Sequence, residues 1–442
     1  MKGTPYKFDG TIYCRDGNDL DYSDPDQSEQ RLLEVIAAVT DLSVGSEELA
    51  AQITDWPSYY HLAPQRVDLL RPIEHLLHGA ILEVGSGCGA ISPFLAQHAQ
   101  SLTALEGSRR RAKLTAMRCR GLPNVSVYCD NFQDSQFDRR FDVVTSIGVL
   151  EYAGCYFDAP YAFDRLAEVL APEGVLIIAI ENRLGLKYLA GAPEDHTGRP
   201  FDGVTDVYRP DSVLTLGREE LNRRIDSAGM EIGTWLYPWP DYKSPELIVS
   251  EAAFREIERD LARWLLPHTI PFQGRVSRSF SEALAWSTVV ENGLGQALAN
   301  SFVVVARHRG NRASTPVEPL VWEYQTGRRR SNATAVHVVK RAGRFWMERQ
   351  RLYPDATPAP KLQIIVPSRE VVPDEPMYDA GLFRILSRER WTVAMVAQWA
   401  SPWLQFLRAL GPSANSVGLP PGRFVRDGAG LRPWGMELVG CP

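Results

Sequence analysis

Short apolar segments alternate with helical segments between residues 80 and 180, and this alternation constrains the fold more than any other feature. Five segments have the length and composition of buried strands: Ala80–Val84, Ser101–Leu105, Val125–Cys129, Phe141–Ile147 and Gly174–Ile180. Helical segments lie between several of them, most clearly Ala90–His98, Ser108–Cys119 and Ala162–Leu170. Strands joined by helices in this way form right-handed crossovers and a parallel sheet. The sequence therefore predicts a doubly wound α/β fold.

Two later segments would complete a seven-stranded, mostly parallel sheet of the Rossmann-like type. A helix is expected over Arg218–Ala228, with Gly229 as a plausible C-terminal cap. Met230–Leu236 is then a candidate sixth strand and Ser301–Arg307 a candidate seventh. The residues between them, about 238–298, are interpreted as an insertion.

The segments outside this core predict a helical cap before the sheet and a smaller module after it. Apolar residues recur at helical spacing from Gln30 to Ile53, and a second helix is expected over residues 63–77. Beyond Gly310, two strand candidates flanking residues 341–343 predict a β-hairpin, and a helix is expected over Trp391–Leu410. We therefore expect a cap over residues 1–78, an α/β domain over 79–310 and an α+β module over 311–442.

Charge and cysteine content narrow the class of protein. The formal net charge is -6, which gives no broad basic surface, so nucleic acid is not an expected partner. Six cysteines without CxxC pairs are expected to be free thiols in a reducing compartment. Residues 1–21 lack the apolar segment of a signal peptide, and no apolar run has the length of a membrane span. We expect a cytoplasmic protein.

A glycine-rich motif, Ile81-Leu-Glu-Val-Gly-Ser-Gly-Cys-Gly89, connects the first predicted strand to a helix. Glycines at 85, 87 and 89 let the chain turn sharply and let a ligand approach the main chain closely. The spacing of Gly85, Gly87 and Ala90 also fits a dinucleotide-binding fingerprint. The motif alone therefore leaves a nicotinamide cofactor as an alternative.

Four carboxylates near the strand ends favour a cationic cofactor. They are Glu83, Glu106, Asp130 and Glu151. Ligands of open α/β sheets bind beyond the carboxyl ends of the strands, so these side chains are expected to lie near one crevice. They would repel a pyrophosphate and attract a sulfonium and an ammonium. Glu106 is placed to bind both ribose hydroxyls and Asp130 to accept a hydrogen bond from adenine. The pattern favours S-adenosylmethionine over NAD; the alternative is that these residues are only turns and caps.

With these motifs, the stretch from about Trp56 to Arg307 resembles the class I S-adenosylmethionine-dependent methyltransferases. The family's glycine motif matches Glu83–Gly89, its ribose acid matches Glu106 and its adenine-side acid matches Asp130. Ile147–Tyr152 resembles the family's segment after strand four, with Tyr152 in place of a frequent histidine. The resemblance implies a methyltransferase whose S-adenosylmethionine is bound by Glu83, Gly85, Ser86, Gly87, Gly89, Glu106, Gly107, Asp130, Asn131, Phe132 and Ile147.

The resemblance also assigns a role to the region ahead of the first strand. It implies that Tyr59, Tyr60 and Arg66 fold over the cofactor, with Tyr60 and Arg66 in the binding site. Arg66 would pair with the carboxylate of the cofactor. A surface salt bridge of Arg66 is the alternative.

Two segments are similar to a narrower bacterial subgroup associated with surface polysaccharide and O-antigen biosynthesis. They are Trp56–Gln65 and Glu181–Gly198. This similarity implies O-methylation of a sugar hydroxyl in a surface polysaccharide or its precursor, with a glycan acceptor and glycan-assembly proteins as candidate partners. The alternatives are a small-molecule natural-product methyltransferase, a non-catalytic methyltransferase-like scaffold in glycan assembly and an NAD-dependent dehydrogenase.

Methyl transfer to a hydroxyl requires a base within hydrogen-bond reach, and His196 is the candidate. It follows the fifth predicted strand in a glycine- and proline-rich loop, and the adjoining Glu194 and Asp195 could raise its pKa. Asp195 and Glu151 are the next candidate bases, although Glu151 could equally be a helix N-terminal acid. A histidine bonded only to the backbone is the alternative for His196. No His, Cys and Asp set has metal-ligand spacing, so no metal is predicted.

Overall fold

The computed structural model describes thirteen stretches of the chain and one single residue. They are residues 5–15, 20, 26–155, 159–209, 212–257, 261–265, 278–311, 319–357, 362–364, 368–375, 377–409, 421–428 with 430–434, and 438–440. Internal contacts divide the chain into two compact units, Met1–Pro245 with Ala297–Val317, and Glu246–Gln296 with Glu318–Pro442. Most of the expected insertion thus groups with the C-terminal residues. The boundaries at residues 78 and 310 stay a prediction.

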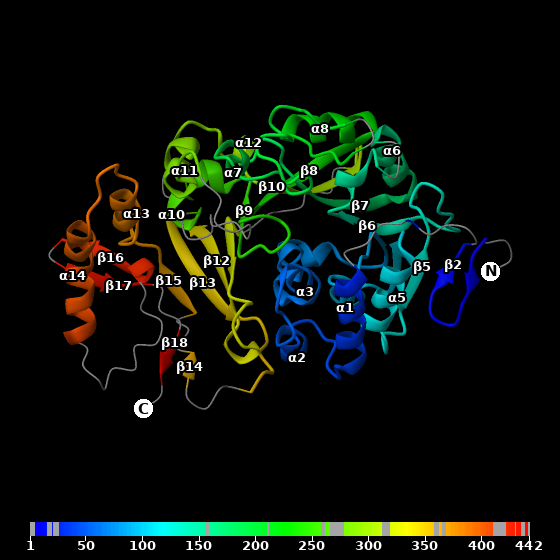
Figure 1. Cartoon of the computed structure of the whole chain (residues 1–442), viewed down its shortest axis with the longest axis horizontal. Helices are drawn as coiled ribbons and strands as arrows, with labels where there is room; N and C mark the ends of the chain where they lie inside the picture. The colour runs from blue at the N-terminus through cyan, green and yellow to red at the C-terminus, as the bar shows by residue number, and fades with distance from the viewer. Residues whose placement is uncertain are drawn as a thin grey trace. The chain divides into compact units, whose positions relative to one another are not determined.

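A mixed β-sheet forms the centre of the first unit (Figure 1). Its strand order is β1 (Lys7–Phe8), β2 (Tyr13–Cys14), β5 (Val125–Cys129), β4 (Ser101–Glu106), β3 (Ala80–Val84), β6 (Phe141–Ile147), β7 (Leu170–Glu181), β10 (Ser301–His308) and β8 (Met230–Trp239). The strands from β5 to β7 pair in parallel, and β10 is antiparallel to both β7 and β8. The order reverses direction between β3 and β6, where open α/β sheets bind ligands.

All seven predicted strands are present, but the predicted count of seven is not confirmed. The strands β1 and β2 extend the sheet, because β2 pairs in parallel with β5. Each of these added strands has two residues and no apolar run, so the sequence gives no strand pattern there. The central strand β7, in contrast, has a clear strand pattern in the sequence. Its residues 175–180 are all apolar and nearly or completely buried, as expected of a strand covered on both faces.

The helices of this unit form two groups: some alternate with the strands, and others precede β3 as a cap. Those that alternate with strands are α4 (Ser92–His98), α5 (Arg109–Arg118), α6 (Ala159–Val169), α7 (Leu186–Leu189) and α8 (Arg218–Ser227). The cap contains α1 (Asp26–Ala38), α2 (Glu47–Ala50) and α3 (Trp56–Leu62), and α1 lies beside α5 (Figure 1). Leu32, Ile36 and Leu62 of the cap share one buried cluster with Cys88 and Leu114. The cap is therefore packed directly on the glycine-rich loop.

The helix expected over residues 63–77 is replaced by two 3-10 helices, Pro64–Leu69 and Arg71–Leu76. Each has a proline in its first turn, and proline fixes φ and removes a donor that a continuing helix needs. Ile73 has a non-helical backbone within the second one. These breaks explain why a single helix does not form.

The second unit contains an antiparallel sheet in the order β9 (Leu247–Ser250), β11 (Val321–Tyr324), β12 (Thr334–Arg341), β13 (Arg344–Arg351) and β15 (Arg369–Val371). The predicted hairpin is confirmed as β12 and β13. Ala342 and Gly343 have positive φ at its turn, as a two-residue hairpin turn requires. Small pairs are formed by β14 (Leu362–Ile364) with β18 (Leu438–Gly440), and by β16 (Phe424–Asp427) with β17 (Gly430–Pro433).

Helices of the second unit include the one predicted near the C-terminus, which is α14 (Val393–Ala409). The others are α9 (Ala253–Glu256), α10 (Leu261–Leu265), α11 (Glu282–Glu291) and α13 (Ala380–Leu386), and α12 (Gly295–Leu298) lies at the boundary between the units. Throughout the described part of the chain, no helix combines the length and the apolar character that crossing a membrane requires.

Candidate active site

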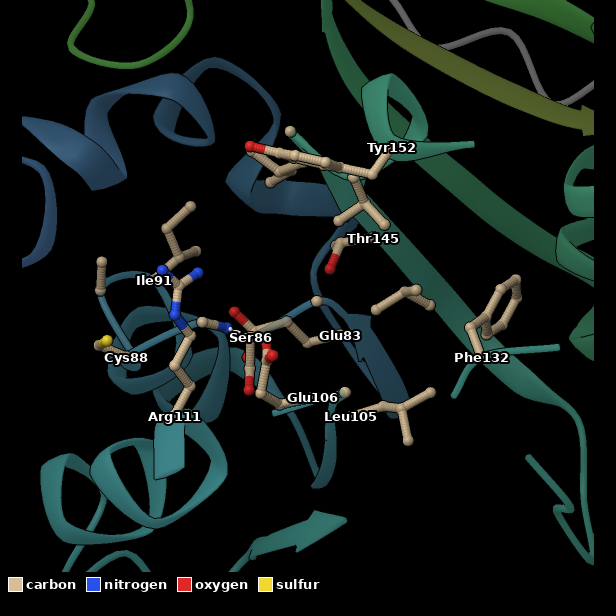
Figure 2. A pocket seen from close by; sticks show the side chains of 18 of the residues that line it. Glu83, Ser86, Cys88, Ile91, Leu105, Glu106, Arg111, Phe132, Thr145 and Tyr152 are labelled. Atoms are coloured by element: carbon tan, nitrogen blue, oxygen red, sulfur yellow. Dashed lines mark hydrogen bonds between the residues drawn. The ribbon is translucent and has the colours of Figure 1, made fainter. Parts of the chain in front are cut away.

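A pocket opens in the first unit at the carboxyl ends of β3, β4, β5 and β6 (Figure 2). It encloses about 1030 Å³ of space outside the protein atoms, its open mouth included. Twelve of the predicted cofactor-binding residues line it: Tyr60, Arg66, Glu83, Gly85, Ser86, Gly87, Glu106, Gly107, Asp130, Asn131, Phe132 and Ile147.

Glycines shape the floor of this pocket in different ways. A Cβ at Gly85 would lie 2.4 Å from Cγ2 of Val149, whereas at Gly87 no described atom lies within 4 Å of that position. Gly89 is outside the described lining. Its φ is +76°, and a Cβ there would lie 3.1 Å from the Cα of Thr115. Gly89 therefore allows close packing of the loop on α5, while Gly85 and Gly87 border the ligand space.

Two buried carboxylates, Glu83 and Glu106, lie together with Ser86 at the centre of the view in Figure 2. Glu106 accepts hydrogen bonds from the amides of Gly87 (2.8 Å) and Ser108 (2.9 Å). Burial, together with the charge of Glu106, raises the pKa of Glu83 to about 8, and burial also raises the pKa of Glu106. Burial destabilises carboxylates that lack a nearby cation. A positively charged ligand in this pocket would stabilise both.

The third predicted acid, Asp130, is buried at the end of β5 and already has protein partners. Its Oδ2 accepts a hydrogen bond from the Tyr6 hydroxyl (2.6 Å) and lies 2.9 Å from the Arg15 guanidinium. Its Oδ1 accepts the amide of Asn131 at 2.9 Å. Tyr6 and Arg15 were not predicted from the sequence.

Tyr60 and Arg66 come from α3 and the following 3-10 helix and lie on the wall of the pocket. The Arg66 guanidinium lies 4.1 Å from the centre of the Tyr60 ring, and one of its terminal nitrogens donates to the carbonyl of Lys243. Among the described residues, nothing accepts a hydrogen bond from the buried Nε of Arg66. Because a buried unpaired donor is costly, a ligand carboxylate here would stabilise the site.

Other residues of the lining were missed by sequence reasoning. They include Leu20, His61, Cys88, Arg111 and Thr145. Arg111 belongs to the basic run Arg109–Arg111, a pattern typical of a solvated helix face, but it is buried and pairs with Glu29 at 2.7 Å. His61 and Cys88 approach one another at 3.8 Å. No local motif marks these contacts, because each joins distant parts of the chain.

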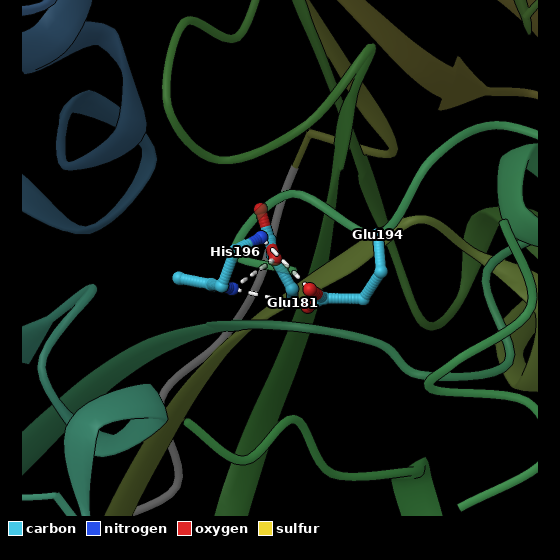
Figure 3. A group of neighbouring side chains, drawn as sticks. All are labelled: Glu181, Glu194 and His196. Atoms are coloured by element: carbon cyan, nitrogen blue, oxygen red, sulfur yellow. Dashed lines mark hydrogen bonds and ion pairs between the residues drawn. The ribbon is translucent and has the colours of Figure 1, made fainter. Parts of the chain in front are cut away.

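A second group of polar side chains surrounds His196 (Figure 3). Glu181 and Glu194 approach the same ring nitrogen, with Nδ1 3.1 Å from Oε1 of Glu194 and 3.7 Å from Oε2 of Glu181. Oε2 of Glu194 accepts the amides of His196 (2.8 Å) and Thr197 (2.6 Å), which fixes the loop. Burial alone would lower the pKa of His196, but the hydrogen bond and charge of Glu194 outweigh it and raise that pKa. His196 is thus oriented by a carboxylate.

Asp195 points to a different set of partners. Its Oδ2 lies 3.0 Å from Nζ of Lys187 and 2.7 Å from Nζ of Lys243. Lys187 also reaches Asp241 at 3.4 Å, and Lys243 forms an ion pair with Glu181. Burial lowers the pKa of Lys243 to about 7. Both ammonium groups lie against the same carboxylate oxygen, so the predicted catalytic residue Asp195 is held in a network of ion pairs.

Glu151 is completely buried in the middle of the 3-10 helix Leu150–Tyr152. Its Oε1 accepts a hydrogen bond from the Tyr242 hydroxyl at 3.0 Å, and nothing in the described part of the chain donates to Oε2. Burial raises the pKa of Glu151, whereas the charges of His196 and Lys243 oppose this shift. Glu151 therefore belongs to the group around His196 rather than to the lining of the cofactor pocket.

The donor atoms of Glu181, Glu194 and His196 all lie within 4.8 Å of one another, close enough to hold a metal ion. Sequence spacing did not reveal this group, because Glu181 ends β7 while Glu194 and His196 lie in the loop that follows α7. Each member already has a protein partner, and the ammonium of Lys243 occupies the side of Glu181. An ammonium beside a donor set competes with a metal cation. The absence of a metal stays a prediction.

Comparison with known proteins supports the assignment of the pocket. Residues 81–174 match a family described as "Methyltransferase domain", and this range contains the glycine loop, Glu106 and Asp130. No curated protein matches the chain.

Several solved methyltransferase structures are similar to the chain. The complex of DhpI with SAH is 21% identical and covers 47% of this chain and 89% of its own, with a TM-score of 0.30. An S-adenosylmethionine-dependent methyltransferase from Clostridium acetobutylicum is 10% identical, covering 59% and 95%, with a TM-score of 0.35. The N-methyltransferase NodS from Bradyrhizobium japonicum with S-adenosyl-L-homocysteine is 14% identical, covering 64% and 100%, with a TM-score of 0.34. Similarity at this level carries no argument about the acceptor.

The family match and the pocket lined by glycines and acids indicate the same class of enzyme. The first unit contains a class I S-adenosylmethionine-dependent methyltransferase domain. The chain is an S-adenosylmethionine-dependent methyltransferase, and S-adenosylmethionine is its cofactor. The NAD-dependent dehydrogenase left open by the glycine motif is therefore wrong.

Proposed function

We propose that this methyltransferase transfers the methyl group to a sugar hydroxyl of a bacterial surface polysaccharide or its precursor, with His196 as the base. The observation that carries the proposal is the pairing of Glu194 with His196 beside the cofactor pocket. Tyr152 lines that pocket and contacts the His196 ring edge-on, with ring centroids 5.5 Å apart. An acceptor placed between Tyr152 and His196 would lie next to the methyl donor.

The cofactor is proposed to lie with its charged groups against the acids and Arg66. Glu106 would accept both ribose hydroxyls, and Asp130 the amino group of adenine. Glu83 would face the ammonium and sulfonium end, and Arg66 would pair with the carboxylate through its unpaired Nε. This orientation matches every cofactor charge with an opposite charge of the pocket.

The chemistry follows from the hydrogen bond of His196. When Nδ1–H donates to Glu194, the lone pair of the ring is on Nε2, which can accept a proton. S-adenosylmethionine would supply the methyl group and would be released as S-adenosylhomocysteine, while Nε2 of His196 would take the proton from the acceptor hydroxyl as its oxygen bonds to the methyl carbon. The negative charge of Glu194 stabilises the resulting imidazolium. Alignment of the acceptor, methyl group and sulfur supplies the remainder of the acceleration.

The sugar class is supported by where the group around His196 comes from. Glu181, Lys187, Glu194, Asp195 and His196 all belong to the segment Glu181–Gly198, which resembles proteins of surface polysaccharide synthesis. The described part of this group offers many hydrogen-bonding side chains, as a polyhydroxylated acceptor requires.

A second candidate, N-methylation of an amine, is favoured by the charge of the same group. Four buried carboxylates and the half-buried Asp195 lie there against two lysines and one histidine: Glu151, Glu181, Glu194, Asp241 and Asp195 against Lys187, Lys243 and His196. An excess of buried negative charge suits an ammonium group.

The two candidates are separated by the methylated atom. The protein is incubated with isotopically labelled S-adenosylmethionine and paired sugars that carry either a hydroxyl or an amino group at the same carbon. Products are identified by mass spectrometry, with His196→Ala as the control for enzyme-dependent transfer. Label on oxygen supports the proposal. Label on nitrogen alone supports the second candidate and overturns the first.

A further inference from the structure

The carboxylate of Asp130 is held by two residues from the beginning of the chain. Its side chain is completely buried, and Oδ2 meets both the Tyr6 hydroxyl at 2.6 Å and the Arg15 guanidinium at 2.9 Å. Both partners lie more than 100 residues from Asp130 in the sequence. The contacts are made because the segment from Tyr6 to Arg15 lies beside β5.

The register of the sheet explains this approach. The strand β2 pairs in parallel with β5, with Tyr13 opposite Tyr128 and Cys14 opposite Cys129. The next residue on each side is Arg15 and Asp130, so the pairing itself brings the guanidinium to the carboxylate. Arg15 is therefore placed by the backbone and not by a chance contact of a long side chain.

Tyr6 is fixed independently. Its ring packs edge-on against Tyr128 with centroids 5.0 Å apart, and its oxygen accepts the amide of Gln136 at 3.0 Å. The Arg15 guanidinium lies 5.6 Å from the centre of the Tyr6 ring and also donates to the carbonyl of Asp134. Burial and the bond to Asp130 raise the pKa of Tyr6 to about 12, so its oxygen keeps the proton that it donates.

The two contacts have a chemical consequence for Asp130. A carboxylate accepts hydrogen bonds and donates none. The arginine at ion-pair distance and the hydroxyl donor both contact Oδ2, so together they hold the carboxylate in one orientation. An acceptor-only group suits the 6-amino group of adenine and repels the 6-oxo group of a hypoxanthine.

We propose that Tyr6 and Arg15 are positioning residues that hold the Asp130 carboxylate in one orientation as a hydrogen-bond acceptor, and that they thereby make the cofactor site selective for a 6-aminopurine over a 6-oxopurine. This inference rests on the proposed contact between Asp130 and adenine. The selectivity would thus depend on Tyr6 and Arg15, which flank β1 and β2, as well as on Asp130, which follows β5.

The test compares dissociation constants of S-adenosylhomocysteine and its 6-oxo analogue, S-inosylhomocysteine, by calorimetry on the full chain. The wild type should prefer the amino form by roughly 10- to 100-fold, because a hydrogen bond to a charged group is at stake. Arg15→Gln and Tyr6→Phe should each reduce this preference by about threefold or more. Arg109→Gln is the control. It removes the ion pair that joins α5 to Asp9, between β1 and β2 and outside the pocket lining, and it should leave the preference unchanged.

The variant Asp130→Asn distinguishes the positioning role of Tyr6 and Arg15 from the proposed contact between Asp130 and adenine. An amide can donate to the 6-oxo group, so this variant should favour the analogue. If Asp130→Asn inverts the preference while Arg15→Gln and Tyr6→Phe weaken both ligands equally, the inference is overturned and the adenine contact stands. If Asp130→Asn leaves the preference unchanged, Asp130 does not contact the purine, and both are overturned.

Discussion

The ring of Tyr152 meets the ring of His196 edge to face, with centroids 5.5 Å apart and planes at 89°. Tyr152 lines the cofactor pocket, whereas His196 belongs to the buried group of carboxylates and lysines. The two polar regions of the first unit are thus in contact through one pair of aromatic rings. If the acceptor binds at His196 as proposed, this contact would place it beside the cofactor pocket, which is the geometry that a direct transfer needs.

Glu106→Ala should weaken binding of S-adenosylhomocysteine by roughly 10- to 150-fold, the equivalent of a lost charged hydrogen bond. Glu106→Gln is the matched control, because it keeps an oxygen that can accept from Gly87 or Ser108. The glutamine variant should bind with intermediate affinity. Calorimetry measures both, and an unchanged dissociation constant for the alanine variant would contradict the ribose contact.

His196→Ala should lower turnover by about 10²- to 10⁴-fold, the range for loss of a positioned base. Cofactor affinity should stay the same, since His196 lies outside the described pocket lining. The exposed His75 provides the control, and His75→Gln should keep full turnover. Near-normal turnover of His196→Ala would remove it from the mechanism.

The pH dependence of turnover should reflect the same imidazole. A base must be neutral, so activity is lost as pH falls through its pKa. Glu194 raises the pKa of His196 above the ordinary value of about 6.5, so the acidic limb should have its midpoint above that pH. Glu194→Gln should move the midpoint to lower pH. A profile that does not move would show that another group sets the limb.

Glu83 should make the cofactor-free protein less stable as the pH rises. Its carboxyl ionises near pH 4.5 when exposed but only near 8 in the folded chain, so between these values the unfolded state loses the proton first. The free energy of unfolding should therefore decrease from about pH 4.5 to about pH 8, by on the order of a few kcal/mol. Urea titrations of the wild type and Glu83→Gln measure this, and equal slopes against pH would contradict it.

Gly87→Ala and Gly89→Ala form a matched pair for the glycine loop. Both positions have positive φ, which costs about 1–2 kcal/mol with a side chain. Only at Gly89 would the new Cβ also press on α5, which should add roughly 1–3 kcal/mol. Unfolding of the cofactor-free variants measures the difference, and equal destabilisation would mean that the loop shifts freely on the helix.

The sequence contains most of the fold because the strands from β3 to β7 are predominantly apolar, a pattern typical of buried parallel strands. It does not contain β1 and β2, which are two residues long and form only because β5 provides a partner. The broken helix over residues 64–76 could have been anticipated from Pro64 and Pro72, since proline interrupts helical hydrogen bonding.

The candidate site likewise contains residues that the sequence predicted and residues that it did not. Glu83, Glu106 and Asp130 stand at strand ends, so topology alone brings them to one edge of the sheet. Lys243 and Glu181 lie more than 60 residues apart, and neither has a local motif that predicts their ion pair with one another. Tyr6 and Arg15 are similar, because their partner is defined by strand register and not by spacing along the chain.

The position of Tyr6 also affects how the protein should be produced. Its hydroxyl touches the carboxylate of Asp130, which lines the pocket. Any alteration of the chain close to Tyr6, such as a deletion or an inserted peptide, would therefore act on a carboxylate of the pocket. Calorimetric data from a protein altered there would report on the alteration as well as on the ligand.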